Sequence, residues 1–376
     1  MKAAVTALAF CVAALLSLGM VMLYSSSMTQ AGAHYLVMQL IWCAIGMGLC
    51  VAAAMVDYRW LRRLAWPLFI LAVVLLMLVL MPHVGRRING ARRWFDIHGV
   101  RFQPSELAKL ALIVMLAWYG DRYQRVIDTW KRGILIPGIL IAVALGLIFV
   151  EPDRGTTILL ATVSGVMLLV AGVRWKHIVP IAALALVGLT ISIVHDPLRM
   201  KRIVSWIDVE EHKSDTGYQA YQAKLALGLG GWTGQGLGNG RQKLGFVPEH
   251  HTDFIFSIIG EELGLTATLS VLAGFMAILL CGVIISINAA DKFGQLLGIG
   301  LSFLIGLQAF INIGVVTSVL PNKGLPLPFI SYGGSNLLAM LTTVGILFSI
   351  ARHSRPGEAV PNRASETDDL PRTKKK

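Results

Sequence analysis

The feature that most constrains this chain is a series of long apolar runs, of which residues 133–150 are a clear example because they contain no charged residue. A helix needs about 20 such residues to cross the hydrocarbon core of a bilayer. A membrane β-barrel would instead show segments of about ten residues with alternating polarity. The sequence therefore predicts an all-α polytopic membrane protein.

The composition agrees with this class. Hydrophobic residues make up 55% of the 376 residues and charged residues only 14%, whereas a soluble domain carries about 25% charged residues. A soluble enzyme, a disordered chain and a secreted disulfide scaffold are therefore excluded. The four cysteines all lie within apolar runs, where we expect reduced packing residues. They are Cys11, Cys43, Cys50 and Cys281.

Ten apolar runs predict ten transmembrane helices. They lie near residues 3–24, 36–56, 67–81, 106–119, 133–150, 156–172, 178–194, 254–286, 295–317 and 333–350. The first run is longer than a signal-peptide core, so we interpret it as a retained span. One long outward loop, about residues 195–253, precedes the eighth span. We expect one membrane domain over 1–353 and a disordered basic cytoplasmic tail over 354–376.

The charge distribution predicts the orientation. An even number of spans places both termini on one side, and the tail ends in Lys374-Lys375-Lys376, so the positive-inside rule predicts cytoplasmic termini. Segment 82–105 is then extracytoplasmic although it carries five arginines. Either the span count is wrong by one, or these arginines bind something anionic outside. The basic residues of the tail and the inner loops are expected to be attracted to anionic membrane lipid. The sequence has no basic stripe with interleaved aromatics, so nucleic-acid binding is not indicated.

The polar candidates gather toward the predicted outer ends of the spans. Pro104 near a helix start predicts Ser105 as N-cap, with Glu106 and Lys109 on one helix face. One interpretation is a capped helix with a salt bridge and an interfacial Trp94. The alternative is a cluster that holds a polar ligand at the membrane edge.

Three more outward segments carry candidates. Asp153 follows a span and is either an N-cap or a functional carboxylate, and Asp253 is either an N-cap or a base at the water boundary. His250 and His251 lack metal-ligand spacing. Residues 320–335 contain three prolines and three glycines, which predict a kinked segment that presents Lys323.

Several sequence blocks together resemble the SEDS family (shape, elongation, division and sporulation) of cell-wall proteins. They are Phe102-Gln103-Pro104-Ser105-Glu106-Leu107-Ala108-Lys109, Glu151-Pro152-Asp153, His251-Thr252-Asp253-Phe254-Ile255-Phe256 with Gly260-Glu261-Glu262-Leu263-Gly264, and the fifteen residues from Pro321 to Ser335. The resemblance covers nearly the whole chain except the tail. The context of Lys323 is more similar to the FtsW division branch than to the RodA elongation branch. Arg154, where the family commonly has Leu, and His250, where it often has a small residue, depart from the pattern.

The resemblance implies a SEDS-type fold and an inverting peptidoglycan glycosyltransferase. Such an enzyme polymerises lipid II on the outer face of the cytoplasmic (inner) membrane, at the division septum, and releases undecaprenyl diphosphate. It implies a class B penicillin-binding protein and other divisome proteins as partners. The alternatives are an elongation polymerase, a lipid II flippase or a scaffold for a transpeptidase. A flippase would need polar residues through the membrane midplane, and the sequence offers only Glu261 and Glu262.

The resemblance also implies the site residues. Asp253 matches the family's essential acidic residue, which we predict to be catalytic. Its carboxylate is also a candidate ligand for a divalent cation (Mg²⁺ or Mn²⁺). No other cofactor is expected. The predicted substrate-binding residues are Arg92, Arg93, Trp94, Gln103, Ser105, Glu106, Lys109, Asp153, Glu249, His251, Lys323 and Ser331.

Overall fold

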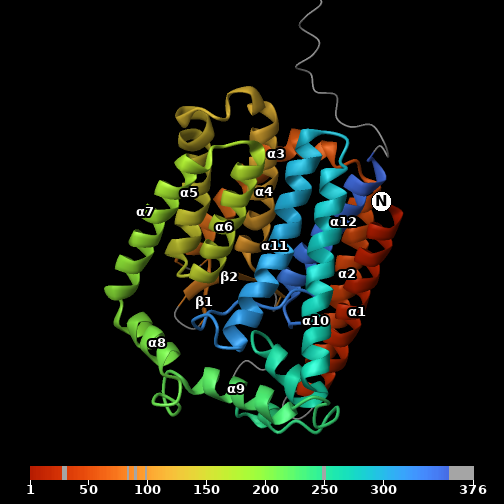
Figure 1. Ribbon diagram of the computed structural model, residues 1–376, viewed down its shortest axis with the longest axis vertical. Coiled ribbons are helices and arrows are strands. Elements are labelled where there is room, and N and C mark those ends of the chain that lie inside the picture. The colour runs from red at the N-terminus through yellow and green to blue at the C-terminus, as the bar shows by residue number, and fades with distance from the viewer. Residues whose placement is uncertain (28–31, 83, 89–90, 98–99, 248–250, 355–376) are drawn as a thin grey trace, which may run out of the picture.

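The computed structural model describes residues 1–27, 32–82, 84–88, 91–97, 100–247 and 251–354. In this part of the chain, long helices lie side by side in a bundle (Figure 1). They are α1 (Lys2–Ser27), α2 (His34–Met55), α3 (Arg59–Leu80), α4 (Pro104–Arg122), α5 (Ile136–Val150), α6 (Arg154–Ala171), α7 (Trp175–Val194), α10 (Ile255–Ile287), α11 (Lys292–Val316) and α12 (Gly334–Arg352).

The ten predicted spans correspond to these ten helices. Nine of the described helices are long and apolar enough to cross a membrane, counting α5 together with the π-helical turn Lys131–Leu135 that precedes it. The tenth, α4, carries Glu106, Lys109 and Asp121 and so falls short by composition, yet most of its residues are buried in the bundle. The prediction of a polytopic membrane protein with about ten helices is confirmed.

The shorter elements lie toward one end of the bundle, which we call the loop end (Figure 1). They are β1 (Arg86–Ile88), β2 (Ala91–Ile97), β3 (Val100–Phe102), α8 (Pro197–Ile207), α9 (Tyr218–Gly230) and the 3₁₀ turn η3 (Gln242–Leu244). The N-terminus lies at the opposite end, and α12 ends there too. The 3₁₀ turn η1 (Gln124–Val126) also lies at that end. Both described termini therefore lie at the same end, as an even number of spans requires.

Two segments that the sequence analysis treated as loops contain regular structure. Residues 195–253 include α8 and α9, and residues 86–102 form a three-stranded antiparallel sheet in the order β1-β2-β3. Arg86 lies opposite Trp94, and Phe95 opposite Phe102. The dipeptide Asn89-Gly90 between the first two strands is a typical hairpin signal in sequence. The strands were missed because each is short and rich in arginine.

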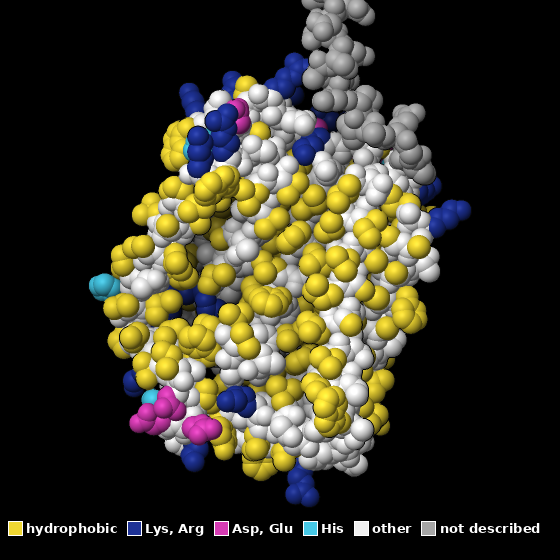
Figure 2. Space-filling model, in the orientation of Figure 1, with side chains coloured by type: hydrophobic (Ala, Val, Ile, Leu, Met, Phe, Trp, Pro, Cys, Tyr) yellow, Lys and Arg dark blue, Asp and Glu magenta, His cyan; other side chains and the backbone are white. Residues whose placement is uncertain are grey.

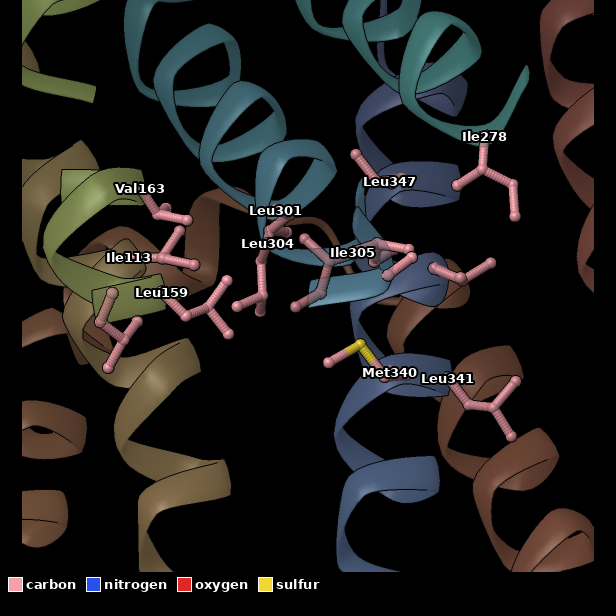
Figure 3. Close-up of a cluster of buried hydrophobic side chains, with 14 of the residues drawn as sticks. Ile113, Leu159, Val163, Ile278, Leu301, Leu304, Ile305, Met340, Leu341 and Leu347 are labelled. Atoms are coloured by element: carbon pink, nitrogen blue, oxygen red, sulfur yellow. The ribbon is translucent and has the colours of Figure 1, made fainter. Parts of the chain in front are cut away.

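The core is built on α4, α11 and α12. In Figure 3, Ile113 of α4 and Leu159 and Val163 of α6 lie beside Leu301 and Leu304 of α11. Met340 and Leu347 of α12 lie on the other side of α11 (Figure 3). All are buried. In contrast, α7 has no buried residue and packs mainly against α8, so it stands at the margin of the bundle.

The surface has the pattern of a membrane protein. Apolar side chains cover the middle of the face drawn in Figure 2, and charged side chains gather at its two ends. Large apolar side chains such as Phe10, Leu184 and Phe310 are well exposed. Such exposure matches burial in lipid rather than in water.

The predicted eighth span, 254–286, is interrupted in the structure. Within α10, Gly264 has a φ of 77°, a left-handed conformation that glycine adopts at little cost. The part of α10 before this kink receives hydrogen bonds from the preceding loop, because Gln235 and Gly236 donate to the carbonyls of Glu261 and Glu262. The part of α10 before Gly264 is therefore tied to the loop that precedes it.

The orientation can be tested with single cysteines in a variant whose four native cysteines are replaced by alanine. Ser214→Cys lies between α8 and α9 at the loop end, and Thr129→Cys lies at the opposite end; both positions are exposed. If the positive-inside rule holds, an impermeant maleimide added to intact cells should label the first cysteine and spare the second. Labelling of the second alone would reverse the orientation.

Candidate active site at the loop end

Asp253 lies where two irregular segments are joined by buried hydrogen bonds. The side-chain amide of Asn312, on α11, donates to the backbone carbonyls of Asp253 (2.8 Å) and Leu325 (2.6 Å). The Ser331 hydroxyl donates to the carbonyl of Thr252 (2.6 Å) and accepts from the backbone N–H of Leu327 (2.8 Å). Residues 251–253 are thus held against segment 321–333.

Asp253 does not act as a helix cap. The N-cap of α10 is Phe254, so the N-cap alternative for Asp253 is wrong, and its carboxylate faces segment 321–333 instead. A Cβ added to Gly324 would lie only 2.5 Å from Oδ2 of Asp253. Glycine at position 324 is therefore what allows the Asp253 carboxylate to lie against this backbone.

A cavity of about 170 Å³ adjoins Gly324 on the side of α6, α7 and α8. Five cationic side chains line it: Arg93, Arg154, Arg199, Arg202 and Lys323. Among the described lining residues, Asp153 is the only acidic one. Figure 2 shows Lys or Arg side chains in a hollow beside α7. Like charges gathered in a partly buried cavity attract an anion.

Among the described residues, most of the cations that line this cavity have no ion pair with a carboxylate. Arg199 forms an ion pair with Asp196 (3.0 Å), but Arg93 donates to the neutral carbonyls of Glu151 (2.8 Å) and Pro152 (2.6 Å). Within the described chain, Lys323 has no hydrogen bond or ion pair, and burial lowers the pKa of its ammonium. An anion in the cavity would stabilise the charged form of Lys323 and so offset the effect of burial.

The structure closes Glu106 and Lys109 inside the bundle. Their charged groups are 2.8 Å apart, and Lys109 is 1% exposed. Lys109 also donates to Gln308 (3.0 Å), whose amide donates to the carbonyl of Pro326 (2.9 Å). The salt bridge of the first interpretation is present and supports segment 321–333. Substrate binding by these two residues stays a prediction.

Three other predicted residues lie around the start of α4 and α6. Asp153 caps α6 by accepting from Thr156 N–H (3.1 Å), and Gln103 donates to its second oxygen (3.4 Å). The N-cap of α4 is Gln103, not Ser105; that prediction was wrong because the helix begins at Pro104, which takes the first helical position. Ser105 is fully buried.

The remaining predicted residues are spread over the loop end. His251 stacks on Tyr35 with ring centroids 4.7 Å apart. Arg93 lines the cavity, whereas Arg92 and Trp94 are not among its described lining residues. Glu249 lies outside the described residues. Their contacts with substrate stay predictions.

Glu261 and Glu262 hold the loop that leads to α10. Glu261 accepts from the backbone N–H of Arg241 (2.7 Å), and Glu262 accepts from Lys243 Nζ (2.6 Å) and Ser25 Oγ (2.7 Å). Both carboxylates lie before the kink at Gly264. They are therefore tied to the loop end and do not form a polar path through the bundle.

A protein-built cation site is not apparent. No group of three or more His, Cys, Asp or Glu side chains gathers within the described residues. Among the described residues Asp253 would be a single protein ligand, fewer than a divalent cation usually takes from a protein site. A cation at Asp253 stays a prediction.

The sequence analysis missed several residues of this site. Arg199, Arg202 and Asn312 were not singled out because their roles depend on how α8 and α11 approach segment 321–333. Glu151 was seen only as part of a sequence block. It is fully buried, and both of its carboxyl oxygens lack a partner among the described residues. Burial, and then the charge of Asp153, raises the pKa of Glu151 to about 8.

Together, the fold and this site define a polytopic membrane protein with a polar, cation-rich site at one end of a ten-helix bundle. Residues 6–356 match the model of the FtsW/RodA/SpoVE family, described as cell cycle proteins. The chain therefore belongs to this family, and the resemblance inferred from the sequence is confirmed.

Similar proteins support the enzyme class. The chain is 40% identical to the probable peptidoglycan glycosyltransferase FtsW of Trichlorobacter lovleyi, over 90% of this chain and 91% of that protein. It is 42% identical to that of Marinobacter nauticus, over 94% and 90%. Its fold matches a chain from a structure described as a peptidoglycan synthase complex that coordinates polymerization and crosslinking (TM-score 0.79, 30% identity, 92% and 96% covered). RodA of Thermus thermophilus also matches (TM-score 0.70, 30% identity, 92% and 95% covered).

The buried ion pair yields a stability prediction. Lys109→Met leaves Glu106 without its cation and should destabilise the protein by about 3–5 kcal/mol. The double variant Glu106→Gln/Lys109→Met removes both charges and should recover most of that loss. Thermal unfolding of the purified variants in detergent measures both. Equal destabilisation in the single and double variants would show that the pair does not behave as a unit.

Glu151 predicts a pH dependence. A carboxyl whose pKa is about 8 when folded and near 4.5 when unfolded takes up a proton on folding, so its contribution to stability falls as the pH rises from about 5 to 8. Glu151→Gln cannot ionise. The unfolding midpoint of the variant minus that of the parent should therefore increase over this range and level off above it. A constant difference would contradict a neutral buried Glu151.

Proposed function

We propose that this protein polymerises lipid II into glycan strands in cell division, as a peptidoglycan glycosyltransferase whose catalytic acid–base residue is Asp253. The observation that carries the proposal is the position of Asp253 against Gly324, which also lines the cationic cavity. The relatives named as probable peptidoglycan glycosyltransferases support the reaction class, and their FtsW names support the division role.

The proposed chemistry is a single displacement with inversion. A sugar hydroxyl of the acceptor attacks the anomeric carbon of the donor, and the bond from that carbon to the lipid diphosphate breaks. The Asp253 carboxylate takes the hydroxyl proton as general base. The leaving diphosphate gains negative charge, which the cations of the cavity stabilise, above all Lys323 and Arg93. Glu106 and Lys109 would act by positioning segment 321–333.

The loop end is proposed to face outward from the cytoplasmic membrane, with both termini in the cytoplasm and the protein placed at the division septum. The positive-inside pattern supports this orientation. A class B penicillin-binding protein is the proposed partner, because a similar chain occurs in a peptidoglycan synthase complex with crosslinking activity. Other divisome proteins are proposed from the division role.

A lipid II flippase is the main alternative. It would need polar groups along a path across the bundle. The two carboxylates that the sequence offered for this role, Glu261 and Glu262, instead bind Arg241, Gln242 and Lys243 at the loop end. The placement of these groups favours polymerisation.

Asp253→Asn tests the catalytic role. Loss of a general base should lower the rate of lipid II polymerisation by about a hundredfold or more, while the unfolding midpoint stays close to that of the parent. The measurement is glycan polymer formed from labelled lipid II by the purified protein, with and without a class B penicillin-binding protein. Asp215→Asn, an exposed carboxylate in the loop between α8 and α9, is the matched control and should polymerise normally.

If Asp253→Asn makes long glycan strands at the parental rate, Asp253 is not the catalytic carboxylate. Glu249 is then the next residue to replace.

A further inference from the structure

Arg154, the first residue of α6, has an unusual environment at the edge of the cavity. Its Nη2 donates to the hydroxyl of Ser192 on α7 (2.7 Å), and its guanidinium lies over the ring of Phe149, 4.6 Å from the centroid. Its Nε and Nη1 are shielded from solvent and have no hydrogen-bond partner among the described residues. Two of its three nitrogens are therefore unsatisfied.

Within the described chain, the guanidinium of Arg154 also has no ion pair with a carboxylate. The neighbouring carboxylate, Asp153, uses its oxygens to accept from the backbone N–H and the hydroxyl of Thr156 and from Gln103. Ser192 offers only a neutral hydroxyl. A guanidinium that is partly buried without a counterion is costly, and unsatisfied buried donors in a native protein commonly mark a missing ligand or ion.

The cavity beside Arg154 has the size and charge for such a ligand. Its volume of about 170 Å³ is far above the 10–15 Å³ or so that a single water needs by this measure. Lys323 and Arg202 line it together with Arg154. Phosphate groups suit this set, because guanidinium groups donate to phosphate oxygens in a planar fork and an ammonium adds a point charge.

We propose that Arg154 binds the diphosphate of the prenyl diphosphate substrate, its guanidinium turning away from Ser192 to donate to the diphosphate oxygens. The proposal deepens the proposed function and rests on it for the identity of the lipid. On binding, Arg154 exchanges the neutral Ser192 hydroxyl for an anionic partner. Arg154 is thus a substrate-binding residue, and Lys323 lines the same cavity.

The test measures the affinity of the purified full-length protein for undecaprenyl diphosphate in detergent. Arg154→Leu should weaken binding by about tenfold or more, the usual effect of losing hydrogen bonds to a charged group. Arg154→Lys should restore part of the affinity, because it returns the charge without the fork. Undecaprenol, which has no phosphate, should bind Arg154→Leu as it binds the parent.

Two controls separate ligand binding from a structural role. Ser192→Ala removes the bond between α6 and α7 but keeps the guanidinium, and should bind undecaprenyl diphosphate at least as tightly as the parent. Arg174→Leu removes an exposed arginine at the far end of α7 and should leave the affinity unchanged.

The result that overturns the proposal is unchanged affinity in Arg154→Leu, or an equal loss in Ser192→Ala, which would make Arg154 only a tie between two helices. The proposed function fails separately. A parent protein that binds undecaprenyl diphosphate through Arg154 but forms no glycan, with or without the partner, would contradict polymerisation and leave the binding role standing.

Discussion

The site depends on one buried amide, that of Asn312, which bonds to the backbone carbonyls of both Asp253 and Leu325. Backbone groups near a membrane must find partners within the protein when water is absent. Segment 321–333 has no regular helix or strand to supply them. Side chains from α11 and from the segment itself do so, and this fixes the Asp253 carboxylate beside Gly324.

The same constraint explains the buried charges. Lys109 donates to Gln308, and Gln308 donates to the Pro326 carbonyl. An ion pair inside the bundle therefore supports the irregular segment from the side of the bundle. Glu262 and Lys243 do the same for the loop before α10. These charges are satisfied by the protein. Most cations of the cavity have no carboxylate partner in the part of the chain that the structure describes. That difference distinguishes the structural charges from the proposed diphosphate site.

The sequence predicted the spans well because all but α4 are long apolar runs, and the run lengths follow from the thickness of a bilayer. The sequence could not predict which charged groups are paired within the protein and stabilise the fold. The spacing of Glu106 and Lys109 indicates a pair, but not that Lys109 is closed off by Gln308 of a distant helix. Arg154 was visible only as a departure from a pattern, since its bond to Ser192 depends on how α7 approaches α6. The strands of 86–102 were missed because arginine hides their alternation.

We propose that the cavity between α6, α8 and segment 321–333 holds the diphosphate of the lipid-linked substrate next to Asp253. An experimental structure of the Asp253→Asn protein bound to lipid II would test this placement. We expect diphosphate density in the cavity, within hydrogen-bond distance of Lys323, with the attached sugar toward position 253. A diphosphate bound at the opposite end of the bundle, or on the lipid-facing surface away from this cavity, would contradict it.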